Sequence, residues 1–205
     1  MKLYYGTTSP YVRKVVVAGI ELGLDDQIER VNTLPWEPDT QYGNVNPVGK
    51  VPALITDDGQ TIYDSPVIID YFDSLHDGPK LIPAKGQERY EVLRIAALAD
   101  GMMDAVILLF SELTRRPEEL HWDFWDDRMR GTVARSLDAL ETDASSFDAS
   151  QPDLGQITTA CGVGWIEFRI ETLGIDFREG HQTLSRWFDE FSERESMKNS
   201  MPVAH

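Results

Sequence analysis

The chain has 205 residues, of which 41% are hydrophobic and 26% charged, and its formal net charge at pH 7 is −16. The longest wholly apolar run, residues 105–110, is far shorter than the roughly 20 residues that span a bilayer, and no basic and apolar leader opens the chain, so neither a membrane location nor secretion is expected. The acidic excess extends over both halves without a basic stripe, which disfavours nucleic acid as a partner. The single cysteine, Cys161, excludes an internal disulfide framework and is typical of a reducing cytoplasm.

The first 75 residues predict short elements that alternate rapidly. Residues 2–5 ("KLYY") predict a strand, helical spacing of apolar residues follows as far as Gly23, and residues 28–31 ("IERV") predict a second strand. Residues 52–56 and 60–63 flank the turn "DDG" and predict a β-hairpin, after which helical spacing returns over residues 65–75. The order β-α-β, an irregular stretch and then β-β-α predicts a thioredoxin-like domain over residues 1–78.

The remainder of the chain predicts helices alone. Residues 79–86 are rich in Gly, Pro and Lys and are interpreted as a linker. Three apolar stripes of helical spacing follow, from Val92 to Leu113, from Trp122 to Leu140 and from Ile157 to Phe168. The third is preceded by Asp153-x-x-Gln156, which has the form of a capping box. The expected fold class is therefore an α/β thioredoxin-like N-terminal domain followed by an all-α helical bundle over residues 87–205.

The turn after the first strand contains Ser9 followed by Pro10, a pattern typical of a helix start, and Ser65-Pro66 has the same form. In a thioredoxin-like domain a Cys-x-x-Cys pair would occupy this turn. Here it reads "SPYV", so the chain cannot carry out thiol–disulfide exchange with its own cysteines. A hydroxyl at a helix N-terminus can instead stabilise the thiolate of a bound ligand. A charged hydrogen bond of about 1.5–3 kcal/mol and a helix end of about 0.3–1 kcal/mol would together make the thiolate the majority form at pH 7.

Several motifs in order resemble the cytosolic glutathione transferases, particularly the bacterial serine-type members. They are "KLYYGTTSPYVRKVVVAGIELGL", "VNTLPW", "NPVGKVPAL", "IYDSPVIIDYF", "LIPA" and "ITTACGVGWIEFR". The resemblance covers essentially the whole chain. It implies a cytoplasmic, homodimeric detoxification enzyme without a metal. Such an enzyme binds glutathione as co-substrate, stabilises its thiolate and directs it against a hydrophobic electrophile.

The resemblance also implies site residues, namely Ser9, Lys50, Val51, Pro52, Asp64 and Ser65. Ser9 would contact the thiolate, with Thr8 as an alternative hydroxyl. Val51-Pro52 would contain a cis bond and pair through its backbone with the cysteinyl part of glutathione. Asp64 and Ser65 would hold the γ-glutamyl ammonium and carboxylate. Lys50 would meet the glycyl carboxylate, or is instead a solvated loop lysine.

The electrophile is expected between the domains, over the first long helix, around Met102, Met103 and Val106. Two other interpretations stay open. One is a non-catalytic binding or regulatory protein on the same fold, and the other is a glutathione-dependent reductase or dehalogenase. The Ser-Ser-Cys run typical of maleylacetoacetate isomerases is absent, which disfavours that activity.

Overall fold

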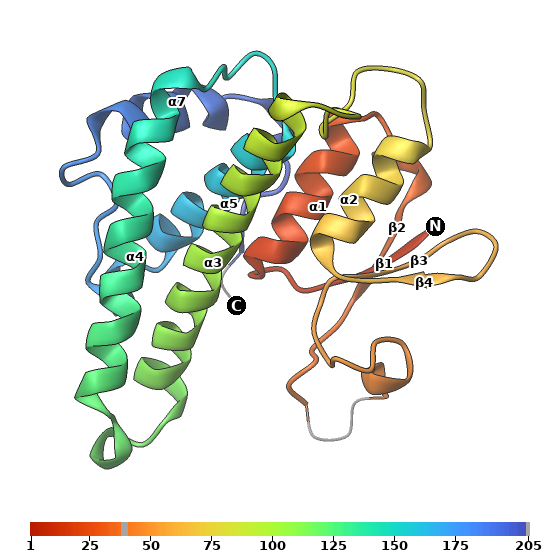
Figure 1. Ribbon diagram of the computed structural model, residues 1–205. Helices are drawn as coiled ribbons and strands as arrows, with labels where there is room; N and C mark the ends of the chain where they lie inside the picture. Colours follow the sequence, from red (N-terminus) through yellow and green to blue (C-terminus); the bar gives the residue numbers. More distant parts are fainter. Residues whose placement is uncertain (38–40, 204–205) are drawn as a thin grey trace. The chain divides into compact units, whose positions relative to one another are not determined.

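The structure is a computed structural model that describes residues 1–37 and 41–203 (Figure 1). The chain forms two compact units. The first comprises Met1–Ala84 together with the residues from Arg194 onward, and the second is Lys85–Glu193. The expected domains divide the chain near the same linker but assign the C-terminal residues to the helical part. The boundaries of the functional domains stay a prediction.

The first unit contains a four-stranded sheet in the order β2-β1-β3-β4. Its strands are β1 (Lys2–Tyr5), β2 (Glu29–Asn32), β3 (Ala53–Ile55) and β4 (Thr61–Ile62). Helix α1 (Pro10–Glu21) connects β1 to the parallel strand β2, whereas β3 pairs antiparallel with β1 and β4. Helix α2 (Ser65–Ser74) follows β4, and Figure 1 shows α1 and α2 side by side on one face of the sheet. The predicted thioredoxin-like order is confirmed.

Helix α1 buries a set of apolar residues that includes Val12, Val15 and Val16. A Cβ atom at Gly19 would lie 3.3 Å from Cδ1 of Ile28 and 3.6 Å from the ring of Phe72, so only a glycine allows this approach without a shift. The helix and its C-cap are followed by Gly23, which has a positive φ, a conformation that glycine adopts readily. Helix position and length thus follow from apolar spacing and from two glycines.

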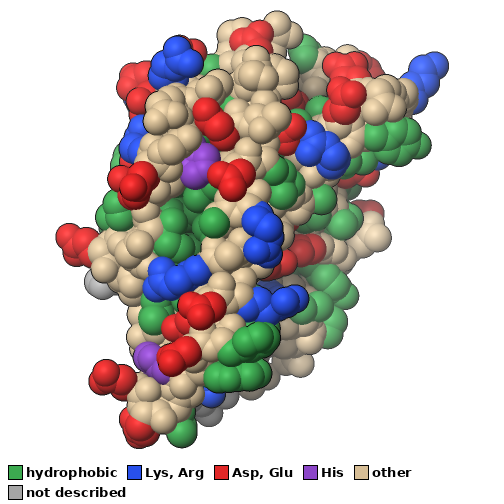
Figure 2. Space-filling model, turned by 60° about the vertical axis from the view of Figure 1, so that its left-hand side comes forward, with side chains coloured by type: hydrophobic (Ala, Val, Ile, Leu, Met, Phe, Trp, Pro, Cys, Tyr) green, Lys and Arg blue, Asp and Glu red, His purple; other side chains and the backbone are tan. Residues whose placement is uncertain are grey.

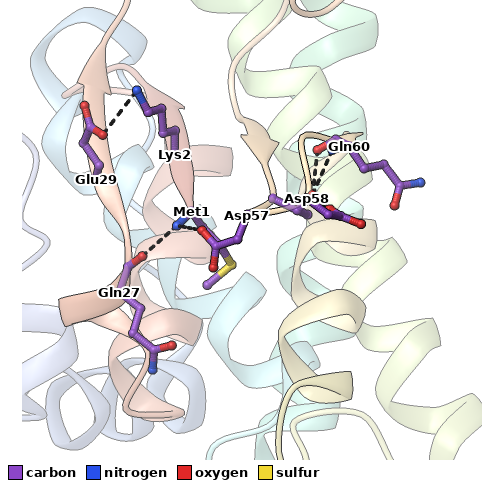
Figure 3. Close-up of polar contacts among 8 residues, drawn as sticks. Met1, Lys2, Gln27, Glu29, Asp57, Asp58 and Gln60 are labelled. Carbon is purple, nitrogen blue, oxygen red and sulfur yellow. Dashed lines mark hydrogen bonds and ion pairs between the residues drawn. The ribbon is translucent and has the colours of Figure 1, made fainter.

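The start of β1 is tied to the turn of the β3–β4 hairpin (Figure 3). The α-amino group of Met1 donates to the carbonyl of Gln27 at 3.0 Å and pairs with Asp57 Oδ1 at 2.7 Å. In the same turn, a hydrogen bond from Thr56 and the backbone of Gln60 hold the pKa of the Asp58 carboxyl below its usual value. These contacts fix the strand register at the sheet edge opposite to the one where β1 ends.

The second unit is helical. It comprises α3 (Gln87–Arg115), α4 (Asp123–Asp143), α5 (Leu154–Phe168), α6 (Ile170–Leu173) and α7 (Gln182–Ser192). The short helix α8 (Glu195–Lys198) belongs to the first unit, and single 3-10 turns occur at Asp25–Gln27, Tyr42–Asn44, Glu118–Leu120 and Ala144–Ser146. Every residue of α5 from Leu154 to Ile166 is buried, and this helix contacts α3, α6 and α7. Helix α5 is therefore the core of its unit. No helix in the described ranges is long and apolar enough to cross a membrane.

The cap predicted for α5 is present, with one difference. Asp153 Oδ1 accepts from the backbone N–H of Gln156 at 2.9 Å, as an N-cap does. The Gln156 side chain donates to Asp153 Oδ2 at 2.8 Å and to the carbonyl of Gln151 at 3.0 Å, rather than accepting from the cap backbone. Its amide oxygen accepts from the indole N–H of Trp187 at 3.2 Å. The cap thereby also anchors α7.

Two sequence-based expectations need correction in this unit. Helix α7 was not predicted, although its buried residues Leu184, Trp187, Phe188 and Phe191 have helical spacing. The predicted α4 stripe begins too early. Trp122 lies before the helix with 59% of its surface exposed, and Phe124 is 60% exposed. Figure 2 shows hydrophobic side chains exposed at the lower end of the α3–α4 hairpin.

Candidate functional site

Strand pairing brings three separate segments to one edge of the sheet. β1 runs toward this edge and leads to Ser9, and β3 starts there because Ala53 lies opposite Tyr4. β4 runs back to the same edge, with Ile62 opposite Leu54, and leads to Asp64. The N-termini of α1 and α2 are therefore both at this edge, together with the Val51-Pro52 segment. A Cβ at Gly6 would lie 3.7 Å from the Val51 side chain, which shows how close the first two segments are.

Ser9 is the N-cap of α1, and Pro10 is its first residue. The Ser9 Oγ accepts from the backbone N–H of Val12 at 3.3 Å, and the Ser9 carbonyl accepts from Arg13 N at 3.0 Å. The side chain is half-buried. Because a hydroxyl is both donor and acceptor, its proton remains available to a further acceptor while Oγ caps the helix. The helix start predicted at Ser9-Pro10 is confirmed.

The Val51–Pro52 peptide bond is cis, as the sequence predicted, and Tyr63–Asp64 is a second cis bond, which was not predicted. The preceding loop is organised around the carbonyl of Lys50. The phenol of Tyr42 donates to this carbonyl at 2.9 Å, and Nδ2 of Asn46 donates to it at 2.7 Å. Burial raises the pKa of Tyr42 to about 12, so the phenol keeps its proton for this bond. The Lys50 side chain itself is exposed.

Asp64 and Ser65 form the start of α2, and their roles differ from those of the first helix. Asp64 is the N-cap and accepts from the backbone N–H of Ser65, which is the first helical residue. The prediction that Ser65-Pro66 starts a helix as Ser9-Pro10 does is therefore wrong by one residue. Ser65 is fully buried, and its Oγ has no hydrogen-bond partner among the described residues. A buried hydroxyl without a partner is uncommon and points to a missing ligand or water.

A cavity of about 180 Å³ lies directly beside Ser9, within the first unit. One wall is the end of β1 and the first turns of α1, including Ser9, Val12 and Arg13. The opposite wall is the C-terminal segment, which includes Met201 and Val203. Arg13 holds this segment in place by donating to the carbonyl of Met197 at 3.2 Å and to Ser200 Oγ at 3.4 Å. The sequence did not predict this wall, because no local pattern indicates where a chain end returns.

The residues expected to line the electrophile pocket lie in the interior of the second unit, and their role toward a substrate stays a prediction. Met102, Met103 and Val106 have no exposed surface. The first two pack against α5, where a Cβ at Gly162 would come within 3.0 Å of Met102 Cε and 3.3 Å of Met103 Cγ. In this structure they are therefore core residues of the second unit. The apolar spacing identified a buried helix face, but it could not distinguish a core face from a pocket wall.

A thioredoxin-like unit with serine in the Cys-x-x-Cys turn, joined to a helical unit, is the architecture of the cytosolic glutathione transferases. Comparison with known proteins supports this class. Residues 8–75 match the family model described as glutathione S-transferase, N-terminal domain. The chain is 34% identical to the uncharacterised GST-like protein YibF of Escherichia coli, over 98% of both chains. It therefore belongs to the glutathione S-transferase family.

Solved structures agree over the whole length of the chain. A glutathione transferase family member from Pseudomonas fluorescens Pf-5, with bound glutathione, has 39% identity and a TM-score of 0.91, covering 99% of both chains. A glutathione S-transferase from Methylobacillus flagellatus, also with glutathione bound, has 32% identity and a TM-score of 0.90, covering 98% of this chain and 99% of the other. The fold class predicted from the sequence is thereby confirmed.

Proposed function

We propose that the protein is a glutathione transferase that binds glutathione at the sheet edge formed by Ser9, Val51-Pro52 and Asp64-Ser65, and that Ser9 stabilises the thiolate. The observation that carries this proposal is the position of the Ser9 hydroxyl at the N-terminus of α1, on the wall of a cavity. Relatives of the same length bind glutathione, which supports the same ligand here. In this site the hydrogen bond and the helix end both favour the ionised thiol.

The start of α2 fits the γ-glutamyl end of glutathione. The buried Oγ of Ser65 has no hydrogen-bond partner among the residues that the structure describes and lies at a helix N-terminus, where an anion such as a carboxylate is stabilised. Asp64 is exposed, and its carboxylate can pair with an ammonium group. The backbone of Val51 precedes β3 at the same edge and can pair with the cysteinyl part of the tripeptide. Lys50 is exposed and free to meet the glycyl carboxylate.

The reaction is a nucleophilic transfer for which the protein supplies orientation and charge stabilisation. The sulfur of the thiolate forms a bond to an electrophilic carbon of an alkyl or aryl substrate. The bond from that carbon to its leaving group breaks, and the leaving group departs with the bonding electrons. A role in detoxification would follow from this chemistry.

The direct test is retention on immobilised glutathione, followed by titration of the ultraviolet thiolate absorbance of bound glutathione. A free thiol has a pKa of about 8.5, and the wild-type complex should titrate at least about one pH unit lower. Ser9→Ala should move this titration back toward the free value, whereas Thr8→Ala should not. Failure of the protein to bind immobilised glutathione would refute the proposal. A titration that Ser9→Ala leaves unmoved would make Ser9 a cap only and transfer the role to Thr8 or the helix amides.

The same site also suits glutathione-dependent reduction or dehalogenation, which differs only in the second substrate, and non-catalytic binding. Retention on glutathione without acceleration of any transfer would favour the binding protein. We also propose a two-fold dimer, which sedimentation at micromolar concentration tests. The chain has a single cysteine, which is buried, and this supports a reducing, cytoplasmic location.

A further inference from the structure

Within residues 1–37 and 41–203, Arg13 is a cation without an anionic partner. Some other arginines of the described chain do form ion pairs, as Arg194 does with Glu21 at 2.6 Å and Arg94 with Asp143 at 2.7 Å. The guanidinium of Arg13 donates only to the Met197 carbonyl and to the Ser200 hydroxyl, which are neutral. In the part of the chain that the structure describes, no carboxylate pairs with it. The charge of Arg13 is therefore not neutralised within the described residues.

Arg13 lies on the wall of the cavity beside Ser9, one helical turn further along α1. Residues four apart lie on one face of a helix, and helical side chains lean toward the N-terminus, which brings the guanidinium toward the Ser9 end. None of the lining residues is acidic. The second arginine of the lining, Arg30, is already neutralised by Asp25. The positive charge of the cavity therefore comes from Arg13.

The rest of the lining is apolar or carries neutral polar groups. Val12 and Val16 are buried in its floor, and Met201 and Val203 are 66% and 59% exposed at its side. The volume of about 180 Å³ is comparable to a cavity of about 150 Å³ that holds one benzene. The space therefore suits a ligand of few heavy atoms that has a short apolar part and an anionic end.

We infer that this cavity binds the second substrate, that the substrate is a small electrophile bearing a carboxylate, and that Arg13 selects it. The inference rests on the proposed function, because the sulfur held by Ser9 is the nucleophile. With chloroacetate as the model substrate, the sulfur bonds to the methylene carbon as the carbon–chlorine bond breaks. Chloride leaves with the bonding electrons, and the product is S-carboxymethylglutathione. Arg13 would act on the carboxylate through charge-assisted hydrogen bonds, which a planar guanidinium makes in pairs.

Two product analogues of equal size test this assignment. S-Carboxymethylglutathione and S-carbamidomethylglutathione differ only in a carboxylate against an amide, and their dissociation constants can be measured by calorimetry. Wild type should prefer the carboxylate by about tenfold or more. Arg13→Gln should remove this preference by weakening the carboxylate ligand alone, and Arg13→Lys should keep part of it. The ratio of the rates with chloroacetate and chloroacetamide, each corrected for the spontaneous reaction, should change among the variants in the same way as the preference for the carboxylate analogue.

Arg13 both carries the positive charge of the cavity and holds the C-terminal segment through hydrogen bonds, and a matched control separates these two roles. Arg194→Gln breaks the ion pair of this segment with Glu21 but changes no residue that lines the cavity, so the preference should survive. Equal affinity of wild type for both analogues would overturn the inference while leaving the proposed function standing. If Arg13→Gln weakened the binding of both analogues equally, the inference would also be overturned, since Arg13 would then contribute to glutathione binding or to the fold. Failure to bind either analogue or glutathione would refute the proposed function itself.

Discussion

Ser9 and Ser65 each precede a proline at a helix start, yet their hydroxyls are in opposite situations. Ser9 Oγ caps α1 by accepting from Val12 N. At α2 the carboxylate of Asp64 does the capping, and Ser65 Oγ is buried without a partner among the described residues. A hydroxyl that is desolvated and unbonded does not stabilise the folded chain, so its presence is better explained by a ligand.

Replacing each serine by alanine is therefore expected to change the free energy of unfolding by a different amount. In urea unfolding without glutathione, Ser9→Ala should lower the free energy of unfolding by about 1 kcal/mol, because an N-cap is removed. Ser65→Ala should change the free energy of unfolding by less than about 0.5 kcal/mol, since no bond is lost. Saturating glutathione should raise the free energy of unfolding less for Ser65→Ala than for wild type, because the variant has lost a contact with the ligand. A large loss for Ser65→Ala without ligand would show that the hydroxyl has a structural partner.

At the scale of elements, α5 packs tightly against α3 in the second unit. Gly155 is in the first turn of α5, and a Cβ there would lie 3.0 Å from both Cβ and Cγ2 of Ile95. It would also lie 3.1 Å from Oδ1 of the capping Asp153. Because Ile95 is β-branched and stiff, neither neighbour can yield easily. The short distance between the two helices thus depends on a missing methyl group.

Gly155→Ala should destabilise the protein by about 1–2 kcal/mol, because the cost of overpacking exceeds the gain in helix propensity. Gly101→Ala is the matched control. Gly101 is in the exposed part of α3, with nothing within 4 Å of an added Cβ. This variant should stabilise the protein by up to about 1 kcal/mol. Thermal and urea unfolding measure both, and the same sign for the two variants would contradict the packing argument.

At the scale of the whole molecule, the polypeptide returns to its first unit at its end. Arg194 pairs with Glu21 through two hydrogen bonds of 2.7 and 2.6 Å, and Ser196 donates to the same carboxylate. Burial alone would raise the pKa of Glu21, but the bonds from Arg194 and Ser196 outweigh it and hold the pKa below 4.5. This cluster connects residues separated by more than 170 positions.

A lowered carboxyl pKa contributes stability that is present above the unfolded pKa of about 4.5 and is lost as the pH falls through the folded value. Glu21→Gln should therefore cost about 2 kcal/mol at pH 7. The difference from wild type should shrink below pH 4.5, where wild type also loses the charge. Chemical unfolding at a series of pH values measures it. A difference that does not depend on pH would mean that packing, rather than charge, holds the C-terminal segment.

The fold was predictable because its signals are local. Apolar spacing and the turn "DDG" predicted all four strands to within two residues at either end, and the linker separated the two kinds of structure. Helix α7 carries a comparable local signal in the helical spacing of Leu184, Trp187, Phe188 and Phe191, so it too is predictable from the sequence. The return of residues from Arg194 to the first unit was not predictable, because it depends on contacts between distant positions.

The candidate site was predictable only in part. The helix start at Ser9 and the cis bond at Pro52 follow from motifs in the sequence. The shift of the second cap from Ser65 to Asp64 depends on backbone angles that a Ser-Pro pair does not specify. The methionines around position 102 were placed on a pocket because periodicity shows that a helix face is buried, but not against what. Arg13 went unnoticed because its lack of an acidic partner appears only in three dimensions.

The return of the C-terminal segment has a consequence for the timing of synthesis. A ribosome delivers β1 and α1 first, and the residues from Arg194 to Val203 only after the whole of Lys85–Glu193 has been made. At about 5–20 residues per second, these roughly 110 residues delay the far wall of the Ser9 cavity by about 5–20 s. A nascent chain can thus complete its sheet and both helix starts while one side of the cavity is still open. The pocket beside Ser9 closes last.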